Sequence, residues 1–344
     1  NENKVYFIAE TPSSGLNNHS FWMYQYVNGN GSGNGGIWED RTMNLPVYNC
    51  TVYYDFDFGN YSSQNSFDMY VKVKPDNENI VFLGGTNIYR STDGFATPNN
   101  YKWIGGYKCN LETPSDYLYP NHHPDQHDLI FYPSNPSIAL SAHDGGISRT
   151  YNCIEDSVKW EDLNNGYITS QFYTVAIEPG ETSNDIIIGG MQDNGTWFTN
   201  STNINKKWKY LLQGDGSYCY ITKNRNNYYL SWQGAKIFKY NIDDNGNVIS
   251  YRRIDPKQTE KQPYLFINPF IIDPNNVNIM YLAVCSEIYR CKNLNSIELN
   301  NDELNPLETG WEPVKYANSG MLGNYITAID MPIYPQDIMF FGTI

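Results

Sequence analysis

The residues best suited to chemistry lie in about a quarter of the chain, between positions 122 and 215. Four of the five histidines fall between His122 and His143, and Asp and Gln side chains occur among and after them. Imidazole and carboxyl groups transfer protons, and carboxamides hydrogen-bond to hydroxyls. We therefore expect a polar site built from His123, Asp125, His127, Asp144, Gln192, Asp193, Asn194 and Asp215.

This set of residues fits three chemistries. Asp144 and Asp193 could act as acid and base on a glycosidic bond. Asp125, His127 and Asp144 could ligate a divalent cation, and such oxygen-rich ligands suit calcium. The whole set could instead hydrogen-bond to sugar hydroxyls or to a peptide. A structural interpretation stays open as well, because Asp-Gly-Gly, Asp-Asn-Gly and Gly-Asp-Gly are all favoured turn sequences.

The elements that would position these residues come from an internal repeat. An apolar strand, an Asn/Asp-rich turn, a second apolar strand, a tight turn and a third strand recur, and a Trp follows most copies. The copies span residues 71–94, 129–152, 175–202, 221–241 and 270–293, with an interrupted one at 325–344. A four-stranded sheet of this size cannot bury both faces alone, and stacking around an axis solves the problem. We predict an all-β propeller of about seven four-stranded blades, the first and last incomplete, forming a single domain over residues 1–344.

One turn of the repeat carries a recognisable motif. Ser91-Thr92-Asp93-Gly94-Phe95, followed by Trp103, resembles the Asp box, Ser-x-Asp-x-Gly-x-x-x-Trp. Its aspartate is expected to accept backbone N–H groups of the turn while the Trp packs between strands. The motif is thus predicted to be structural.

Arginines also recur in the repeat. Arg90, Arg149 and Arg290 share one repeat position, and we expect them to belong to the scaffold. Sialidase chemistry is disfavoured, because it needs arginines that clamp a carboxylate.

Propeller topology predicts where the polar turns lie. Turns from the second to the third strand of a blade, and connections into the next blade, emerge on one face. Asp144 and Asp193 occupy turns of the first kind; His123, Asp125 and Asp215 precede or begin first strands. Three neighbouring blades are therefore expected to direct these residues to one mouth.

Composition excludes several classes of protein. The net charge of −14 argues against a nucleic-acid partner. No apolar run approaches the length of a transmembrane helix, and the six cysteines include no Cys-x-x-Cys pair.

The Gly-rich run from Gly29 to Gly36 is predicted to be a turn between strands. Asp55 and Asp57 are predicted to lie on a solvated strand face. Cys285 and Cys291 are not expected to pair with each other.

Motifs between His123 and Asp215 give a family resemblance. The segments HDGGISRT, IIGGMQDNGT and GDG, in this order, resemble secreted bacterial BNR-repeat (Asp-box) propellers, which are related to sortilin-type propellers and more distantly to xyloglucanase-type glycoside hydrolases. The resemblance implies a secreted or cell-surface protein, with tethering through C-terminal sequence beyond this chain. It places Asp144 where the xyloglucanase-type enzymes carry an Asp, whereas their second catalytic Asp is not identifiable.

We interpret the chain as a binding or adhesion module that engages a glycan or an extracellular protein. A glycoside hydrolase acting on polysaccharide through Asp144 and Asp193 is the first alternative. A structural scaffold of a surface assembly is the second.

Overall fold

The computed structural model describes the chain apart from residues 1–2, 49–58, 109–117, 168–169, 181–185 and 319–324. The chain divides into two compact units, Asn1–Ile168 and Thr169–Ile344, each described by itself below. The prediction of a single domain remains a prediction. Asp55 and Asp57 lie outside the described residues.

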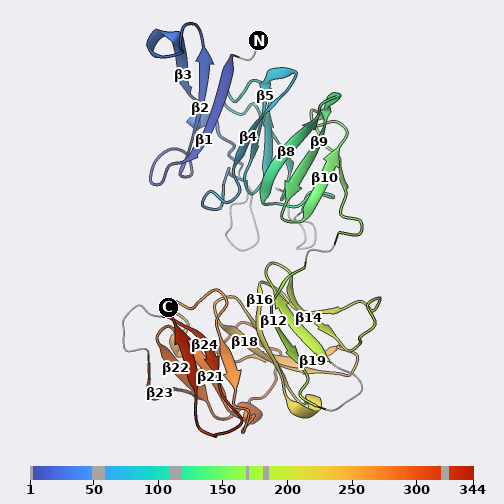
Figure 1. Ribbon diagram of the computed structural model, residues 1–344, viewed down its shortest axis with the longest axis vertical. Coiled ribbons are helices and arrows are strands. Elements are labelled where there is room, and N and C mark those ends of the chain that lie inside the picture. The colour runs from blue at the N-terminus through green and yellow to red at the C-terminus, as the bar shows by residue number, and fades with distance from the viewer. Residues whose placement is uncertain (1–2, 49–58, 109–117, 168–169, 181–185, 319–324) are drawn as a thin grey trace. The chain divides into compact units, whose positions relative to one another are not determined.

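The first unit contains three antiparallel sheets, each with its strands in sequence order (Figure 1). The first sheet has three strands, β1 (Lys4–Glu10), β2 (His19–Tyr26) and β3 (Gly36–Asp40). The second has β4 (Tyr70–Lys74), β5 (Asn77–Gly84), β6 (Ile88–Ser91) and β7 (Tyr101–Gly105). The third has β8 (Gln126–Tyr132), β9 (Asn135–His143), β10 (Gly146–Thr150) and β11 (Trp160–Asp162).

The second unit contains four sheets built in the same way. The first three each have four strands: β12 (Phe172–Ile177), β13 (Ile187–Met191), β14 (Gly195–Thr199) and β15 (Lys209–Leu212); β16 (Gly216–Ile221), β17 (Tyr228–Trp232), β18 (Lys236–Ile242) and β19 (Val248–Arg253); β20 (Phe270–Ile272), β21 (Met280–Val284), β22 (Glu287–Cys291) and β23 (Trp311–Asn318). The last has β24 (Ile326–Asp330) and β25 (Phe340–Thr343). The only helices in the described residues are short 3-10 turns at Gly33–Gly35, Thr42–Asn44, Lys223–Arg225, Lys257–Thr259 and Leu294–Ser296.

The predicted fold class is confirmed: the described residues form an all-β propeller with seven antiparallel sheets, of which the first and last are incomplete. Within each unit the first strands of successive sheets contact one another, as β4 and β8 do in the first unit and β16 and β20 in the second. This is the packing that stacked blades require.

Apolar residues on both faces of the sheets explain why the blades must stack. Val81, Phe82 and Leu83 are consecutive in β5 and fully buried, so both faces of that strand are covered. Val81 and Leu83 pack with Phe21 of the first sheet, whereas Phe82 packs with Leu129 of the third. Each such side chain contributes about 1.5–3 kcal/mol when it is fully buried.

Tryptophans at the start of the fourth strands also link neighbouring sheets. The indole N–H of Trp160 donates to the Ile104 carbonyl of the preceding sheet at 2.7 Å. Trp311 donates to the Ile254 carbonyl at the same distance. Trp160 and Trp311 therefore mark contacts between blades, whereas the indole N–H of Trp103 donates to the Gly105 carbonyl of its own strand at 3.0 Å.

The turn at Asp93 has the predicted hydrogen bonds. Its carboxylate accepts the backbone N–H groups of Ala96 and Thr97, each at 3.1 Å. The Ser91 hydroxyl accepts the Phe95 N–H at 2.8 Å. The Gly-rich run is likewise the connection between β2 and β3.

The recurrent arginines belong to the scaffold, as predicted. Arg90 is buried, and its Nη1 donates to the carbonyls of Cys153 and Glu155 in the next sheet, each at 2.8 Å. Arg149 and Arg290 instead pair across their own sheets with glutamates of the fourth strands, at 2.7 Å or less.

Two further predictions concern cysteines and membrane spans. Cys285 and Cys291 are both free, as expected, as are Cys153 and Cys219. Among the described residues no helix has the length and apolar character needed to cross a membrane.

Candidate functional site

In the first unit, backbone hydrogen bonds bring together the loops that carry the predicted residues. Asp125 lies just before β8 with φ of 64°, and its N–H donates to the Thr86 carbonyl at 2.9 Å. The Asp144 N–H, in the turn from β9 to β10, donates to the Asp125 carbonyl at 3.1 Å. The two aspartates are thus fixed side by side at one end of the sheets.

An exposed hydrogen-bonded pair of side chains lies beside them. Nε2 of His127, at the start of β8, is 2.5 Å from Oδ1 of Asp144, and about half of each side chain is exposed. Asp125 is half-buried and accepts a hydrogen bond from the Gln64 carboxamide. Asp125, His127 and Asp144 therefore lie in one cluster of this unit, and His123 is among the groups that act on Asp125. That the cluster is a functional site stays a prediction.

A buried carboxyl that sequence reasoning missed completes the cluster. Asp68 is only 4% exposed, and its N–H donates to the Ser63 carbonyl at 3.0 Å. Burial, followed by the charges of Asp125 and Asp144, raises the pKa of Asp68 to about 7, although His127 acts in the opposite sense. Asp68 therefore holds a proton near neutrality and shares a hydrogen bond with Asp125.

Asp125 is perturbed in the same direction. Burial and the neighbouring Asp144 charge raise its pKa, while His123, Gln64 and Asp68 lower it. Three carboxyl groups this close cannot all ionise without repulsion, and the shared proton relieves it. No sequence motif marks Asp68, because it lies in the irregular connection between β3 and β4.

In the second unit, the predicted residues form a second group. The N–H of Asp193, in the turn from β13 to β14, donates to the Asp215 carboxylate at 2.8 Å. The Asp215 N–H in turn donates to the Gln233 carboxamide at 3.0 Å. The Tyr173 hydroxyl, which sequence reasoning also missed, donates to Gln192.

Tyr173 responds electrostatically to this group. Burial, then the charges of Asp215 and Asp193, raises its pKa, so its hydroxyl keeps its proton. The structural interpretation is also supported here, since Asp193 has a φ of 55° and the carboxamide of Asn194 donates to the Gln192 carbonyl at 3.0 Å. That the groups of the two units share one mouth stays a prediction.

The cation predicted for Asp125, His127 and Asp144 finds no support. Across the described ranges, no group of three or more His, Cys, Asp and Glu side chains could hold a metal ion. The Asp144 carboxylate is instead hydrogen-bonded to Nε2 of His127.

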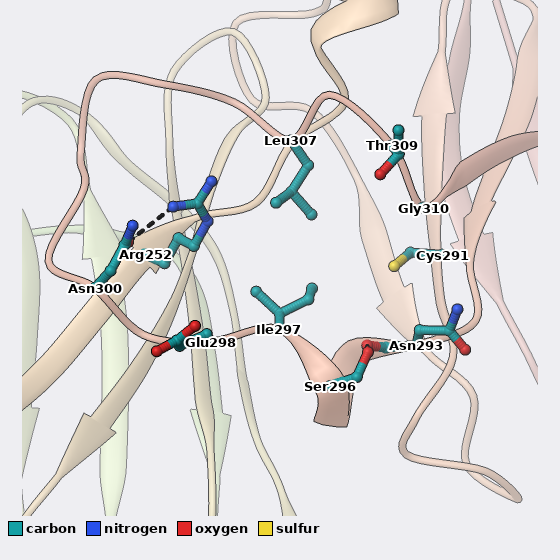
Figure 2. A pocket seen from close by; sticks show the side chains of 10 residues that line it. All are labelled: Arg252, Cys291, Asn293, Ser296, Ile297, Glu298, Asn300, Leu307, Thr309 and Gly310. Carbon is teal, nitrogen blue, oxygen red and sulfur yellow. Dashed lines mark hydrogen bonds between the residues drawn. The ribbon is translucent and has the colours of Figure 1, made fainter.

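The second unit has a separate pocket of about 330 Å³ beneath the connection from β22 to β23. Figure 2 shows Ile297 and Leu307 facing each other across it and Arg252 beside Asn300. Nη1 of Arg252 donates to that carboxamide at 2.8 Å. The buried ammonium of Lys239 donates to the Leu294 and Ile297 carbonyls at 2.8 and 3.1 Å. The cationic groups around this pocket are thus engaged in holding the connection.

Comparisons with known proteins give weak likenesses. No family model and no curated protein match the sequence. Similar solved structures include the RRP9 WD40 repeats, at 10% identity over 50% of this chain and 49% of that one, with a TM-score of 0.27. An ancestral GH74 enzyme matches at 14% identity over 74% of this chain and 31% of its own, with a TM-score of 0.30. The chain therefore spans about half and about a third of these two structures, and the fold assignment rests on the sheets themselves.

Proposed function

We propose that the chain is a secreted or cell-surface binding module whose polar cluster engages a neutral glycan. The observation that carries the proposal is the cluster of the first unit, in which the exposed Asp144 and His127 lie beside the half-buried Asp125. Carboxylate, imidazole and carboxamide groups held by backbone bonds present the donors and acceptors that sugar hydroxyls need.

The charges of the cluster favour a neutral ligand. Its polar groups are three carboxyls, two histidines and the Gln64 carboxamide, and besides burial these groups have the largest effects on the pKa of Asp68 and of Asp125. An anionic ligand would meet repulsion without a guanidinium to receive it. A protein partner is the other class that the sequence suggests, and it is an outcome of the test.

The test is a screen of glycans and polysaccharides that scores binding and release of reducing sugar. Wild type is compared with Asp144→Ala and with Asp156→Ala, an exposed aspartate of the same unit paired with Lys102. We expect binding without release, weakened about tenfold or more by Asp144→Ala and unchanged by the control. Glycan binding that survives Asp144→Ala, or no glycan binding at all, would overturn the proposal; the latter outcome favours a protein partner or a scaffold.

A glycoside hydrolase is the second candidate, and one observation favours it. The pKa of Asp68 is raised to about 7, so about half of the molecules hold a proton on this carboxyl at neutral pH, and a carboxyl with a raised pKa is the general acid of such enzymes. It ranks second because the Asp68 side chain is buried, out of reach of a glycosidic oxygen.

The hydrolase has its own test. The pair proposed from sequence is Asp144 and Asp193. Sugar release from a polysaccharide that is abolished by Asp144→Asn and by Asp193→Asn, with binding retained, would establish this candidate. Release unaffected by both variants would rule the pair out.

The extracellular location and kinship with Asp-box, sortilin-like propellers are part of the same proposal. The hydrogen-bonded turn of Ser91 and Asp93 supports that kinship. Detection of the full-length product on the cell surface or in the medium, by an antibody against this chain, tests the location. A product confined to the cytoplasm would contradict it.

A further inference from the structure

A pocket of about 290 Å³ in the first unit has buried imidazoles in its wall. It lies beside the turn from β9 to β10, and its polar lining includes Tyr119, Asn121, His122, His123, His143 and Asn164. Its volume is at the lower end for ligand sites, which suits a single sugar ring or a small polyol.

Hydrogen bonding fixes the tautomer of His122. The ring is 4% exposed, and its Nδ1 accepts the Gly106 N–H at 3.0 Å. A neutral ring that accepts at Nδ1 carries its proton at Nε2. That Nε2–H is buried and has no partner.

The opposite situation holds at His143. Its Nε2 is 2.8 Å from the Ser148 hydroxyl, which donates its only proton to the Asn121 carbonyl at 2.7 Å. The hydroxyl must therefore accept from His143, so the ring carries its proton at Nε2 and has a lone pair at Nδ1. That Nδ1 is buried without a partner as well.

The two rings thus offer one unused donor and one unused acceptor close together. Their centroids are 4.7 Å apart. Burial lowers the pKa of His122 well below its usual value and that of His143 to about 4, so both rings are neutral at physiological pH. An unpaired buried donor or acceptor destabilises the folded chain, and a ligand supplying both partners would remove that destabilisation.

We propose that this pocket binds a hydroxyl-bearing ligand, a neutral monosaccharide or small polyol, through the free Nε2–H of His122 and the free Nδ1 of His143. A hydroxyl oxygen accepts from the first ring and donates to the second, whereas a carboxylate cannot donate and an ammonium cannot accept. Both nitrogens are closed to solvent in the unliganded chain, so a hydroxyl reaches them only when side chains of the pocket wall move to admit it. The proposal stands apart from glycan binding at Asp144, because a free polyol could fill this pocket in either case.

The experiment is nitrogen NMR of the full chain labelled with ¹⁵N-histidine, titrated with glucose, galactose, mannose, xylose and glycerol. Without ligand, His122 and His143 should both be neutral Nε2–H tautomers at pH 7. A binding sugar should shift the His143 Nδ1 and His122 Nε2 signals in a saturable way. His19 is the internal control, since it is buried with both ring nitrogens hydrogen-bonded, at 2.6 and 2.7 Å, and should not shift.

Variants separate this site from the one proposed above. His143→Phe keeps an aromatic ring but removes the acceptor, and the affinity of the shifting sugar should fall about tenfold or more. Asp144→Ala should leave the histidine shifts in place, since Asp144 does not line this pocket. If His143→Phe does not fold, the wild-type titration decides alone. An Nδ1–H tautomer at either ring would overturn the proposal. So would shifts at His19 as large as those at His122 and His143, or signals showing that both nitrogens stay hydrogen-bonded to water with every sugar tested.

Discussion

Replacing Asp68 with Asn tests the electrostatics of the cluster. The side chain is buried beside Asp125 and Asp144, and its pKa rises from 3.8 to about 7. Asn has the shape of a protonated Asp and can donate to Asp125 in the same way, but it cannot ionise. The variant therefore isolates the cost of ionising this one carboxyl.

The sign follows from proton binding. A carboxyl whose folded pKa exceeds its unfolded value stabilises the fold below the unfolded pKa and loses that contribution as pH rises through the folded one. Between 3.8 and about 7, the difference corresponds to about 4 kcal/mol at about 1.4 kcal/mol per pH unit. Asp68→Asn should thus match wild type near pH 4 and exceed its stability by up to about 4 kcal/mol at pH 8.

Urea unfolding at pH 4, 6 and 8 measures this difference, and carboxyl carbon NMR reads the titration of Asp68 directly. Asp156→Asn is the matched control, because that side chain is 87% exposed; its stability relative to wild type should stay constant between pH 6 and 8. The reasoning is refuted if Asp68 titrates near 4, or if Asp68→Asn destabilises the chain equally at pH 6 and pH 8.

Three more predictions follow from the scaffold, the first two checked by urea unfolding against wild type. Asp93→Ala should lower the free energy of unfolding by about 1–3 kcal/mol, because backbone N–H groups of its turn lose their acceptor; no change would show that water replaces it. Arg90→Ala should lower the free energy of unfolding by about 2–4 kcal/mol, because the carbonyls of Cys153 and Glu155, in the connection between β10 and β11, lose the donor of a buried guanidinium. Arg149→Ala breaks an exposed pair and should cost under about 1 kcal/mol; equal losses would contradict this. In alkylation with peptide mapping, the partly exposed Cys285 should react before the buried Cys153, and the reverse order would show that the sheet around Cys153 opens.

Much of the fold was predictable because the repeat contains several apolar strands that must be buried on both faces. Runs such as Val81-Phe82-Leu83 bury both faces of a strand, and only stacked sheets provide two cores. The recurring Trp residues mark where a fourth strand meets the previous sheet, as at Trp160. The hydrogen bonds of the turn at Asp93 were predictable too, since the carboxylate accepts N–H groups of residues that follow it closely in the sequence.

The site was predictable only where turns carry it. Asp144 and Asp125 follow from blade topology, because the ends of successive strands place them. Asp68 does not, because it reaches the cluster from an irregular connection whose path depends on tertiary contacts such as the one between its N–H and Ser63. His122 and His143 appeared in the sequence as members of a histidine-rich stretch, but their unused nitrogens depend on which carbonyls and hydroxyls their other nitrogens meet.

The location of the arginines limits what the cluster can bind. Arg90 is buried and holds the next sheet, and Arg149 and Arg290 are held by glutamates on neighbouring strands. Arg252 and Lys239 are engaged around a pocket of the other unit. The arginines of the repeat thus stabilise the scaffold, whereas the polar cluster contains carboxyls that share a proton. Hydroxyl groups donate and accept hydrogen bonds without adding charge, which is why both proposals name neutral sugars and polyols.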